Sequence, residues 1–314
     1  MKADILTVKE FLLGNDSFAV LCHKSPDGDT LGSAFALVFG LRQLGKKARV
    51  ISPDPIPSKY SYVTDHYCDE AFEEKTIIAV DVADTKLLGC CEEEYGGRVD
   101  LCIDHHPSNK DYAKITLLDG EAAATAQIIH RVLCELGVEI DRCIASCIYT
   151  GLSTDTGCFR YPNTQPETHR VAALMMEKGA EAAMINRLMF ETKSRARLSV
   201  EREVFKNMQF FLDGRCAVAF VTRDLLEKTG IADDELDGFA AMTRQIEGVC
   251  VGVFLREVQN GFKASVRTGD EVDASAVCKR FGGGGHFRAA GCTIELELDC
   301  AKEKIVEVIS EYLK

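Results

Sequence analysis

The sequence lacks the features that mark membrane and secreted proteins. Among its 314 residues, no stretch approaches the ~18 consecutive apolar residues that a membrane span needs. The first segment, MKADILTVKEFLLGND, carries acidic side chains throughout, and it has neither the unbroken apolar run nor the small-residue cleavage site of a signal peptide. We therefore expect a cytoplasmic protein that does not associate with membranes.

Cysteine pairs in the C-x-x-C spacing are also absent, although the sequence has 14 cysteines. Without such pairs a structural zinc site is disfavoured. Cys22, Cys102, Cys147 and Cys250 lie within apolar runs, where we expect small buried side chains. Because domains of this size do not need disulfides to stabilise a core, we expect reduced thiols.

Positive charge is scarce as well. The sequence has 37 Lys and Arg residues against 49 Asp and Glu residues, which gives a formal net charge of -12. Long nucleic-acid footprints depend on clustered basic residues that neutralise many phosphates, so the composition argues against them. A local pocket for one small anion remains compatible with this balance, and carboxylates are available for a hard cation.

The order of apolar segments predicts an α/β fold in two domains. Short uninterrupted apolar segments alternate with helical ones in the first part, which is typical of a parallel sheet with helices on both faces. The predicted strands are residues 18–22, 48–51, 76–80 and 101–103. The predicted helices are residues 31–44, 123–136, 142–152, 166–178 and 182–189.

A charged helical connector, residues 191–214, is expected to join this first domain, residues 1–190, to a smaller α/β domain, residues 215–314. The strands predicted in the second domain are residues 216–221, 249–257, 261–266 and 291–296, and its helices lie near residues 233–242, 272–281 and 301–312. Asn260 and Gly261 between two of these strands predict a tight β-hairpin.

Acidic and imidazole side chains follow several predicted strands. His23, Asp27 and Asp29 lie in one short segment after the first strand. The ends of parallel strands meet at the edge where such sheets bind ligands. An imidazole and two carboxylates on a tight loop suit a hard metal ion. The alternative is an ordinary turn in which Asp29 caps the following helix.

Asp81 follows another strand, Asp104, His105 and His106 follow the next, and Asp155 ends an apolar helix. Asp81 and Asp155, each taken alone, are also compatible with a turn, a cap or a helix terminus, whereas two histidines beside an acid at a strand end favour a site. Adjacent side chains on an extended backbone point to opposite sides, so we expect some of the three consecutive residues to bind metal while another faces a substrate. Together, so many carboxylates in one crevice would repel each other without cations. The cluster therefore implies metal, with two ions of Mn²⁺, Mg²⁺ or Fe²⁺ favoured over structural zinc.

A run of four glycines precedes His286 in the second domain. Consecutive glycines let backbone N–H groups approach a phosphate closely, and His286 can add a charged donor. Arg267, at the end of a predicted strand, can bind an anion with two N–H groups. The alternative is a flexible turn beside a surface arginine. We predict substrate binding by these residues: Arg267, Gly283, Gly284, Gly285 and His286.

The order of these motifs, H-x3-D-x-D, a strand-end Asp, D-H-H and D-T-G, resembles that of the DHH phosphoesterases, and FGGGGHFRAAG resembles their C-terminal DHH-associated domain. Within that family the chain is most similar to the bifunctional oligoribonucleases, or nanoRNases, that also dephosphorylate 3′-phosphoadenosine 5′-phosphate (pAp). In one departure, relatives commonly have a serine before Thr125, where this chain has Ala124, so a substrate hydroxyl contact at this position is doubtful.

The resemblance implies a site in which Asp81 bridges two ions. One ion would be held by His23, Asp27 and Asp81, and the other by Asp29, Asp81, His105 and Asp155. His106 and Asp104 would be the catalytic residues, with His106 facing the scissile phosphate and Asp104 as its buried partner.

The implied activity is hydrolysis of oligoribonucleotides, from dinucleotides to pentanucleotides, to mononucleotides, and of pAp to AMP and phosphate. The implied attack comes from a hydroxide that bridges two Mn²⁺ ions, with Mg²⁺ or Fe²⁺ as alternatives. We expect the chain to bind these short substrates and no long nucleic acid. The resemblance is also compatible with a homodimer. The alternatives are a cyclic- or linear-dinucleotide phosphodiesterase, an inorganic pyrophosphatase and a non-catalytic nucleotide-binding regulator.

Overall fold

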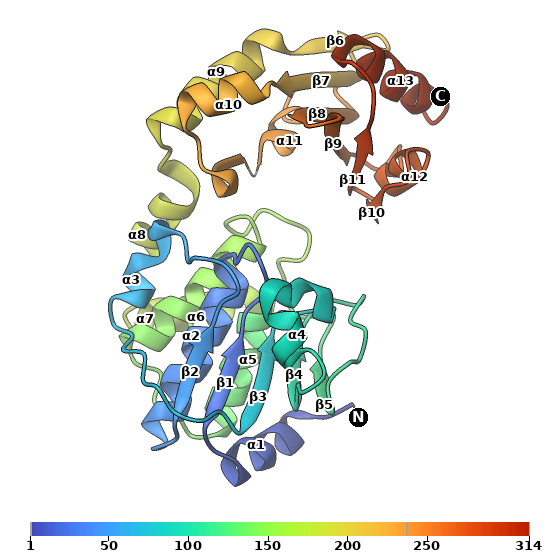
Figure 1. Cartoon of the computed structure of the whole chain (residues 1–314). Coiled ribbons are helices and arrows are strands. Elements are labelled where there is room, and N and C mark those ends of the chain that lie inside the picture. Colours follow the sequence, from blue (N-terminus) through green and yellow to red (C-terminus); the bar gives the residue numbers. More distant parts are fainter. Residues whose placement is uncertain (1, 237, 314) are drawn as a thin grey trace. The chain divides into compact units, whose positions relative to one another are not determined.

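The computed structural model describes residues 2–236 and 238–313. These residues form two compact units, one ending at Thr192 and the other beginning at Lys193. Each unit contains one sheet with its own helices (Figure 1). The predicted α/β fold class is confirmed, with a parallel sheet in the first unit and a second, mixed sheet in the other. Within the described ranges, no helix is long and apolar enough to cross a membrane.

The sheet of the first unit has the strand order β2-β1-β3-β4-β5, and all of its neighbouring strands are parallel. Its strands are β1 (Phe18–Leu21), β2 (Ala48–Ile51), β3 (Thr76–Val80), β4 (Leu101–Asp104) and β5 (Ile115–Leu118). The first four agree with the predicted strands. The fifth was not predicted, although its β-branched residues Ile115 and Thr116 favour a strand, and it pairs with β4.

The four long helices predicted in this unit are present as α2, α5, α6 and α7. One helix, α1, was not predicted. The segment predicted as the last helix, residues 182–189, is divided between α8 and η3. The helices are α1 (Ile5–Gly14), α2 (Gly28–Gln43), α3 (Ser61–Thr64), α4 (Glu92–Tyr95), α5 (Thr125–Glu135), α6 (Arg142–Asp155), α7 (Pro166–Glu177) and α8 (Ala182–Asn186). Short helical turns form η1 (Ser58–Tyr60), η2 (Thr85–Cys91) and η3 (Arg187–Glu191).

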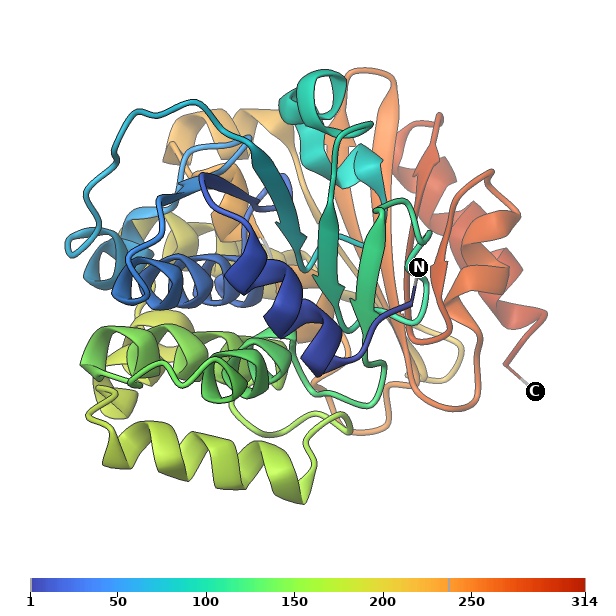
Figure 2. The same cartoon turned by 90° about the horizontal axis from the view of Figure 1, so that it is seen from below.

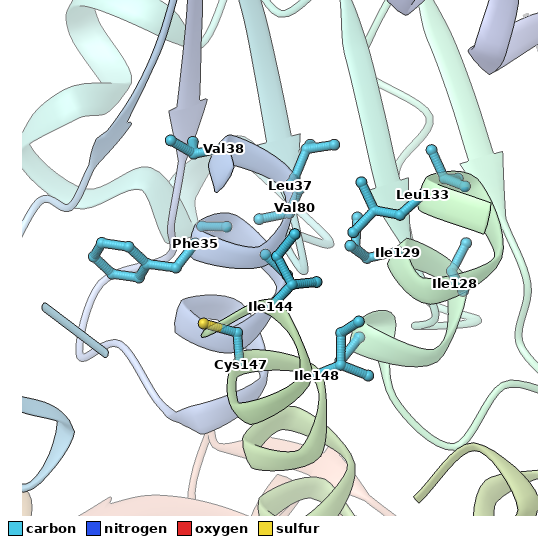
Figure 3. Packing of buried hydrophobic residues seen from close by; sticks show 14 of the residues in the cluster. Phe35, Leu37, Val38, Val80, Ile128, Ile129, Leu133, Ile144, Cys147 and Ile148 are labelled. Carbon is cyan, nitrogen blue, oxygen red and sulfur yellow. The ribbon is translucent and has the colours of Figure 1, made fainter. Parts of the chain in front are cut away.

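Alternate residues of the strands enter two separate cores, because successive side chains on a strand point to opposite faces. Phe18 and Val20 of β1 lie in the larger core with residues of α1, α2, α5 and α6, and Figure 3 shows Val80 of β3 beside side chains of α2, α5 and α6. Ala19 and Leu21 lie in a smaller core with residues of η2 and α4. Helical segments thus cover both faces of the sheet (Figure 2).

Two glycines allow α2 and α6 to approach closely. A side chain at Gly32 would have its Cβ 2.3 Å from the carbonyl oxygen of Cys147, and a Cβ at Gly151 would lie 2.6 Å from Oδ1 of Asp29. Asp29 lies in the first turn of α2, and Asp155 ends α6. The close crossing therefore brings two of the predicted metal ligands into one region.

The sheet of the second unit has the order β10-β11-β9-β8-β7-β6, and only its β7–β8 pair is parallel. Its strands are β6 (Gln209–Phe211), β7 (Cys216–Val221), β8 (Val251–Val258), β9 (Gly261–Thr268), β10 (Gly284–His286) and β11 (Ala289–Ile294). Its helices are α9 (Arg195–Asn207), α10 (Arg223–Thr229), η4 (Asp233–Leu236), α11 (Phe239–Met242), α12 (Ala274–Lys279) and α13 (Leu298–Ser310).

The hairpin predicted at Asn260 is confirmed, since Val258 pairs with Gly261. The predicted connector is helical only as far as Asn207, after which β6 pairs with β7. The end of the glycine run, for which a flexible turn was the alternative, is a short strand that pairs with β11. The predicted burial of Cys22, Cys102 and Cys147 is confirmed. The predicted burial of Cys250 is wrong, since this residue is partly exposed just before β8 begins.

Candidate metal centre

The loop after β1 places His23 and Asp27 at the edge where the strands end. Nδ1 of His23 lies 2.8 Å from the carbonyl oxygen of Lys24, which leaves Nε2 facing Oδ1 of Asp27 at 3.5 Å and Oδ2 of Asp81 at 3.7 Å. Oδ1 of Asp27 also accepts a hydrogen bond from the backbone N–H of Asp29 at 3.0 Å. The alternative in which Asp29 caps α2 is therefore wrong, because Asp27 is the cap.

Asp29 is buried, with 1% of its surface exposed, and its carboxylate contacts the N-terminus of a different helix, α5. Its two carboxylate oxygens accept hydrogen bonds from the backbone N–H groups of Thr125 at 2.7 Å and Ala126 at 2.9 Å, in the first turn of α5. The hydroxyl of Ser33 donates a third hydrogen bond at 3.3 Å. Burial raises the pKa of Asp29, so these donors hold a carboxylate that is costly to ionise in this place.

Asp81 occupies the middle of the cluster, directly after β3, and is almost fully buried. Its backbone has φ of 60°, in a region that residues other than glycine rarely adopt and that costs about 1–3 kcal/mol. Its N–H donates to the carbonyl of Ile103 at 3.0 Å, and its Oδ1 accepts from the hydroxyl of Thr125 at 2.9 Å. Burial and the carboxylates of Asp29 and Asp27 raise the pKa of Asp81 well above its usual range.

Nε2 of His105 is the atom that points most directly to a bound metal ion. Its Nδ1 lies 3.2 Å from the carbonyl oxygen of Ala122, whereas its buried Nε2 has no hydrogen-bond partner among the described residues. Around Nε2 lie Oδ2 of Asp155 at 3.6 Å, Oδ1 of Asp81 at 3.7 Å and Oδ2 of Asp29 at 3.9 Å. These separations exceed a hydrogen bond. They fit ligands of one ion, because two atoms each about 2.1 Å from an ion lie within about 4.2 Å of each other.

Asp155 closes this side of the cluster at the end of α6. The amide of Asn163 donates to its carbonyl at 3.2 Å and to its Oδ2 at 3.4 Å. Burial and the carboxylates of Asp29 and Asp27 raise the pKa of Asp155 to about 8. Three raised carboxyl pKa values in one place mean that full ionisation requires a compensating positive charge, which divalent cations supply.

The structure brings all six predicted metal ligands together. Their atoms form two groups, in each of which all members lie within 4.8 Å of one another, and a third such group joins Asp81 to His105 and His106. The donors are carboxylates and imidazoles without a thiol, which fits Mn²⁺, Mg²⁺ or Fe²⁺. The two main groups are His23, Asp27 and Asp81, and Asp29, His105 and Asp155.

His106 differs from His105 in its partner. Its Nδ1 lies 2.8 Å from Oδ1 of the fully buried Asp104, whose Oδ2 accepts from the amide of Asn109 at 2.6 Å. The hydrogen bond to Asp104 raises the pKa of His106. The predicted opposite orientation of the two histidines is wrong, because β4 ends at Asp104 and the two rings lie 4.4 Å apart.

Three residues that form hydrogen bonds with the predicted site residues were not identified from the sequence. Thr125 contacts both Asp29 and Asp81, Asn109 holds Asp104, and Asn163 holds Asp155. The only available signal was proximity in the sequence, since Asn109 follows the D-H-H motif and Asn163 follows the D-T-G motif within a few residues.

Comparison with known proteins identifies the family. The model of the DHH family, N-terminal domain, matches residues 17–152, and that of the DHHA1 domain matches residues 213–314. A bifunctional oligoribonuclease and PAP phosphatase NrnA of Thermus thermophilus is 35% identical over 94% of this chain and 89% of its own length. The chain belongs to the DHH family. The Bacillus subtilis protein of the same name is 26% identical over 89% of this chain and 90% of its own length.

Solved structures show the same DHH-family fold. An exopolyphosphatase-related protein from Bacteroides fragilis superimposes with a TM-score of 0.88 at 27% identity, covering 98% of this chain and 96% of its own. RecJ of Thermus thermophilus in complex with Mn²⁺ has a TM-score of 0.58 at 14% identity, covering 98% of this chain and 54% of its own. The RecJ match supports the fold alone.

In the DHHA1 unit, the predicted substrate-binding residues lie on neighbouring strands. His286 of β10 pairs with Ala289 of β11, which pairs with Arg267 of β9, so these three side chains share one face of the sheet. Val266 enters the core, so this shared face is the opposite one. Among the described residues no carboxylate forms an ion pair with Arg267, whereas Arg288 pairs with Asp270. The guanidinium of Arg267 donates to the carbonyl of Val266 at 3.1 Å, and it keeps further N–H groups that can contact an anionic ligand.

Packing explains some of the glycines of the run but not all of them. A Cβ at Gly283 would lie 2.2 Å from the carbonyl oxygen of Gly291, and one at Gly285 would lie 2.6 Å from that of Ala289, so packing against β11 explains both glycines. A Cβ at Gly284 would meet nothing within 4 Å. Packing therefore does not explain Gly284, which is the glycine most consistent with close approach of a ligand.

Proposed function

We propose that this DHH-family phosphoesterase hydrolyses short oligoribonucleotides to mononucleotides and pAp to AMP and inorganic phosphate. The observation that carries the proposal is the buried Nε2 of His105, which has no hydrogen-bond partner within residues 2–236 and 238–313 and lies among the carboxylates of Asp29, Asp81 and Asp155. The names of the Thermus thermophilus and Bacillus subtilis relatives support the choice of substrates, because both cover nearly the whole chain.

The six clustered side chains fit divalent ions, for which we propose Mn²⁺, with Mg²⁺ or Fe²⁺ as alternatives. Two such ions would supply an activated water molecule and would neutralise charge on the phosphate. We assign the bridging position to Asp81, because its carboxylate faces His23 on one side and His105 on the other.

His106 is proposed to act on the substrate. With Nδ1 held by Asp104, its Nε2 remains available to the phosphate or to the leaving oxygen. Because the hydrogen bond to Asp104 raises the pKa of His106, the imidazolium form that donates a proton is favoured. Asp104 therefore serves as a positioning residue that fixes both the orientation and the protonation of His106.

In the DHHA1 unit, we propose that Arg267, His286 and the backbone N–H groups of the glycine run bind a second phosphate or nucleotide of the substrate. A guanidinium and an imidazole on one face of the sheet suit a phosphate. The net charge of -12 gives a long strand no extended basic path, so we propose short substrates.

The proposed compartment is the cytoplasm. All 14 cysteines are free, including the exposed Cys68, Cys90, Cys134 and Cys300. Exposed thiols persist in a reducing environment.

A product assay tests the proposal. The purified chain is incubated with pAp, an RNA series from dinucleotide to pentanucleotide, a cyclic dinucleotide and pyrophosphate, each with Mn²⁺ and with a chelator. We expect AMP and phosphate from pAp and mononucleotides from the RNA series, both abolished by the chelator. Asp81→Asn is the matched control, because it keeps the volume of the side chain and removes its charge.

Two other outcomes would overturn the proposal. Turnover of only the cyclic dinucleotide or only pyrophosphate would identify a different phosphoesterase of the same family. Nucleotide binding with no turnover of any substrate, in a chain that retains its metal, would identify a non-catalytic regulator.

A further inference from the structure

The segment after α6 has a backbone that the metal ligands do not explain. Gly157, Cys158 and Phe159 have φ of 56°, 60° and 61°, so three consecutive residues adopt the left-handed region. Two of them carry a Cβ, and such conformations persist only where the surroundings impose them. The strained residues lie within four positions of Asp155, and strained backbone is concentrated at functional sites.

The surroundings of this segment fix it in several ways. The N–H of Cys158 donates to the carbonyl of Ser153 at 2.7 Å, and the N–H of Phe159 donates to Oγ1 of Thr156 at 2.9 Å. The ring of Phe159 stacks on the imidazole of His169, with 5.3 Å between the ring centroids. The chain therefore reverses direction in a fixed way directly after α6.

This reversal of the chain determines the position of Tyr161. Its N–H donates to the carbonyl of Thr156 at 3.0 Å, and its ring lies against the backbone of Gly157, where an added Cβ would be 2.3–2.6 Å from the ring atoms. Nevertheless, 53% of its surface is exposed. An aromatic ring supported on one side and open to solvent on the other is a surface on which a planar group can stack.

The segment that carries the ring is linked to the metal centre through Asp155. Gly157 is two residues from Asp155, so their Cα atoms are at most about 7.6 Å apart. Asn163, two residues after Tyr161, donates hydrogen bonds to both the carbonyl and the carboxylate of Asp155. The segment that carries the ring is thus attached to a proposed metal ligand at both ends.

We infer that Tyr161 is a specificity-determining residue whose ring stacks on the base of the nucleotide whose phosphate is hydrolysed. The inference rests on the proposed function and deepens it by assigning the base contact. Stacking on an aromatic ring tolerates every base, because each base has a π face. The enzyme would therefore prefer nucleotides to other phosphate esters without selecting a sequence.

The first test combines removal of the ring with removal of the base. Tyr161→Ala and Tyr161→Phe are assayed on 2′-deoxyadenosine 3′,5′-bisphosphate and on its counterpart without a base, 1,2-dideoxyribose 3,5-bisphosphate. We expect Tyr161→Ala to lower kcat/KM about 10-fold on the nucleotide, mainly through KM, and to leave the abasic compound unaffected. Tyr161→Phe should behave as the parent on both. Equal losses of Tyr161→Ala on the two compounds, or no loss on either, would overturn the inference.

The second test measures stacking without turnover. The sequence has no tryptophan, so Tyr161→Trp introduces a single indole whose fluorescence reports on a stacked base. We expect AMP to quench this fluorescence and ribose 5-phosphate to leave it unchanged. The control is Phe205→Trp on α9, at a side chain of similar exposure, where neither compound should have an effect.

The two tests separate the inference from the proposed function. If the parent does not hydrolyse pAp but AMP still quenches Tyr161→Trp, the proposed activity fails while the base contact stands. If the parent hydrolyses pAp but AMP does not quench this variant, the activity stands and the base contact is overturned.

Discussion

His105 and His106 show how two neighbouring residues of one type acquire different chemistry. Nε2 of His105 is buried among three carboxylates and has no hydrogen-bond partner in the described chain, whereas Nδ1 of His106 is held by Asp104. The first arrangement suits a metal ligand and the second suits a general acid, because a carboxylate partner stabilises the imidazolium.

We therefore predict opposite effects of removing the two imidazoles. His105→Ala should lose one of two bound ions. His106→Ala should keep both ions but lose a factor of about 10²–10⁴ in kcat, the usual contribution of a general acid. Metal content of the two purified variants, measured beside kcat on pAp, checks this. Equal metal loss in both variants would contradict the assignment.

That the predicted ligands lie close together could be predicted from the sequence, but the contacts that distinguish them could not. Acids and histidines at strand ends indicated Asp81 and His105, because parallel strands end at one edge. The hydrogen bonds that distinguish the two histidines depend on where β4 ends, and the contact of Thr125 with Asp29 joins residues 96 positions apart. Neither is readable from spacing alone.

At the scale of elements, the hairpin of β10 and β11 shows that the glycines of one motif can be required for different reasons. Gly283 packs on β11, whereas Gly284 borders open space. The glycines were predicted to let backbone N–H groups approach a phosphate, with a flexible turn as the alternative. The pairing of β10 was not predicted, since three residues containing two glycines have little strand propensity of their own.

We predict that Gly283→Ala and Gly284→Ala separate folding from binding. At Gly283 the new methyl group would meet the carbonyl of Gly291, and such overpacking costs about 1–3 kcal/mol, so Tm should fall. At Gly284 the methyl group has room, so Tm should stay unchanged while KM for pAp rises. Thermal unfolding and steady-state kinetics of both variants decide the matter. A Gly284→Ala variant with parental KM would mean that no ligand approaches this glycine.

At the scale of the whole molecule, the first unit contains a self-repelling group of acids. Burial and neighbouring carboxylates raise the pKa of Asp155 to about 8, and those of Asp29 and Asp81 are also raised. The unfolded chain releases these protons near its ordinary pKa of about 4, so the metal-free folded state holds more protons between about pH 4 and pH 8. Its stability must then fall as the pH rises through this window.

We predict that divalent ions oppose this fall. Binding replaces the retained protons, so Mn²⁺ added at pH 7 should release protons into a weakly buffered solution. It should also raise the Tm of the first unit more at pH 8 than at pH 5, because fewer protons compete with it at higher pH. An indicator dye and calorimetric scans at the two pH values measure both effects. A metal-free Tm that rises from pH 5 to pH 8 would contradict the raised pKa values.

The two units are also expected to divide the work on the substrate, with the reacting phosphate bound by the first and a remote phosphate bound by Arg267 of the second. Remote binding energy aligns the reacting group without contacting it. Arg267→Ala should therefore keep its metal content and lose about 1.5–3 kcal/mol in kcat/KM on pAp or a dinucleotide, the scale of a charge-assisted hydrogen bond. Bis-p-nitrophenyl phosphate, which has no remote phosphate, should be hydrolysed almost as by the parent. Equal losses on both substrates would mean that Arg267 acts at the reacting phosphate or in folding, and the division between the units would be wrong.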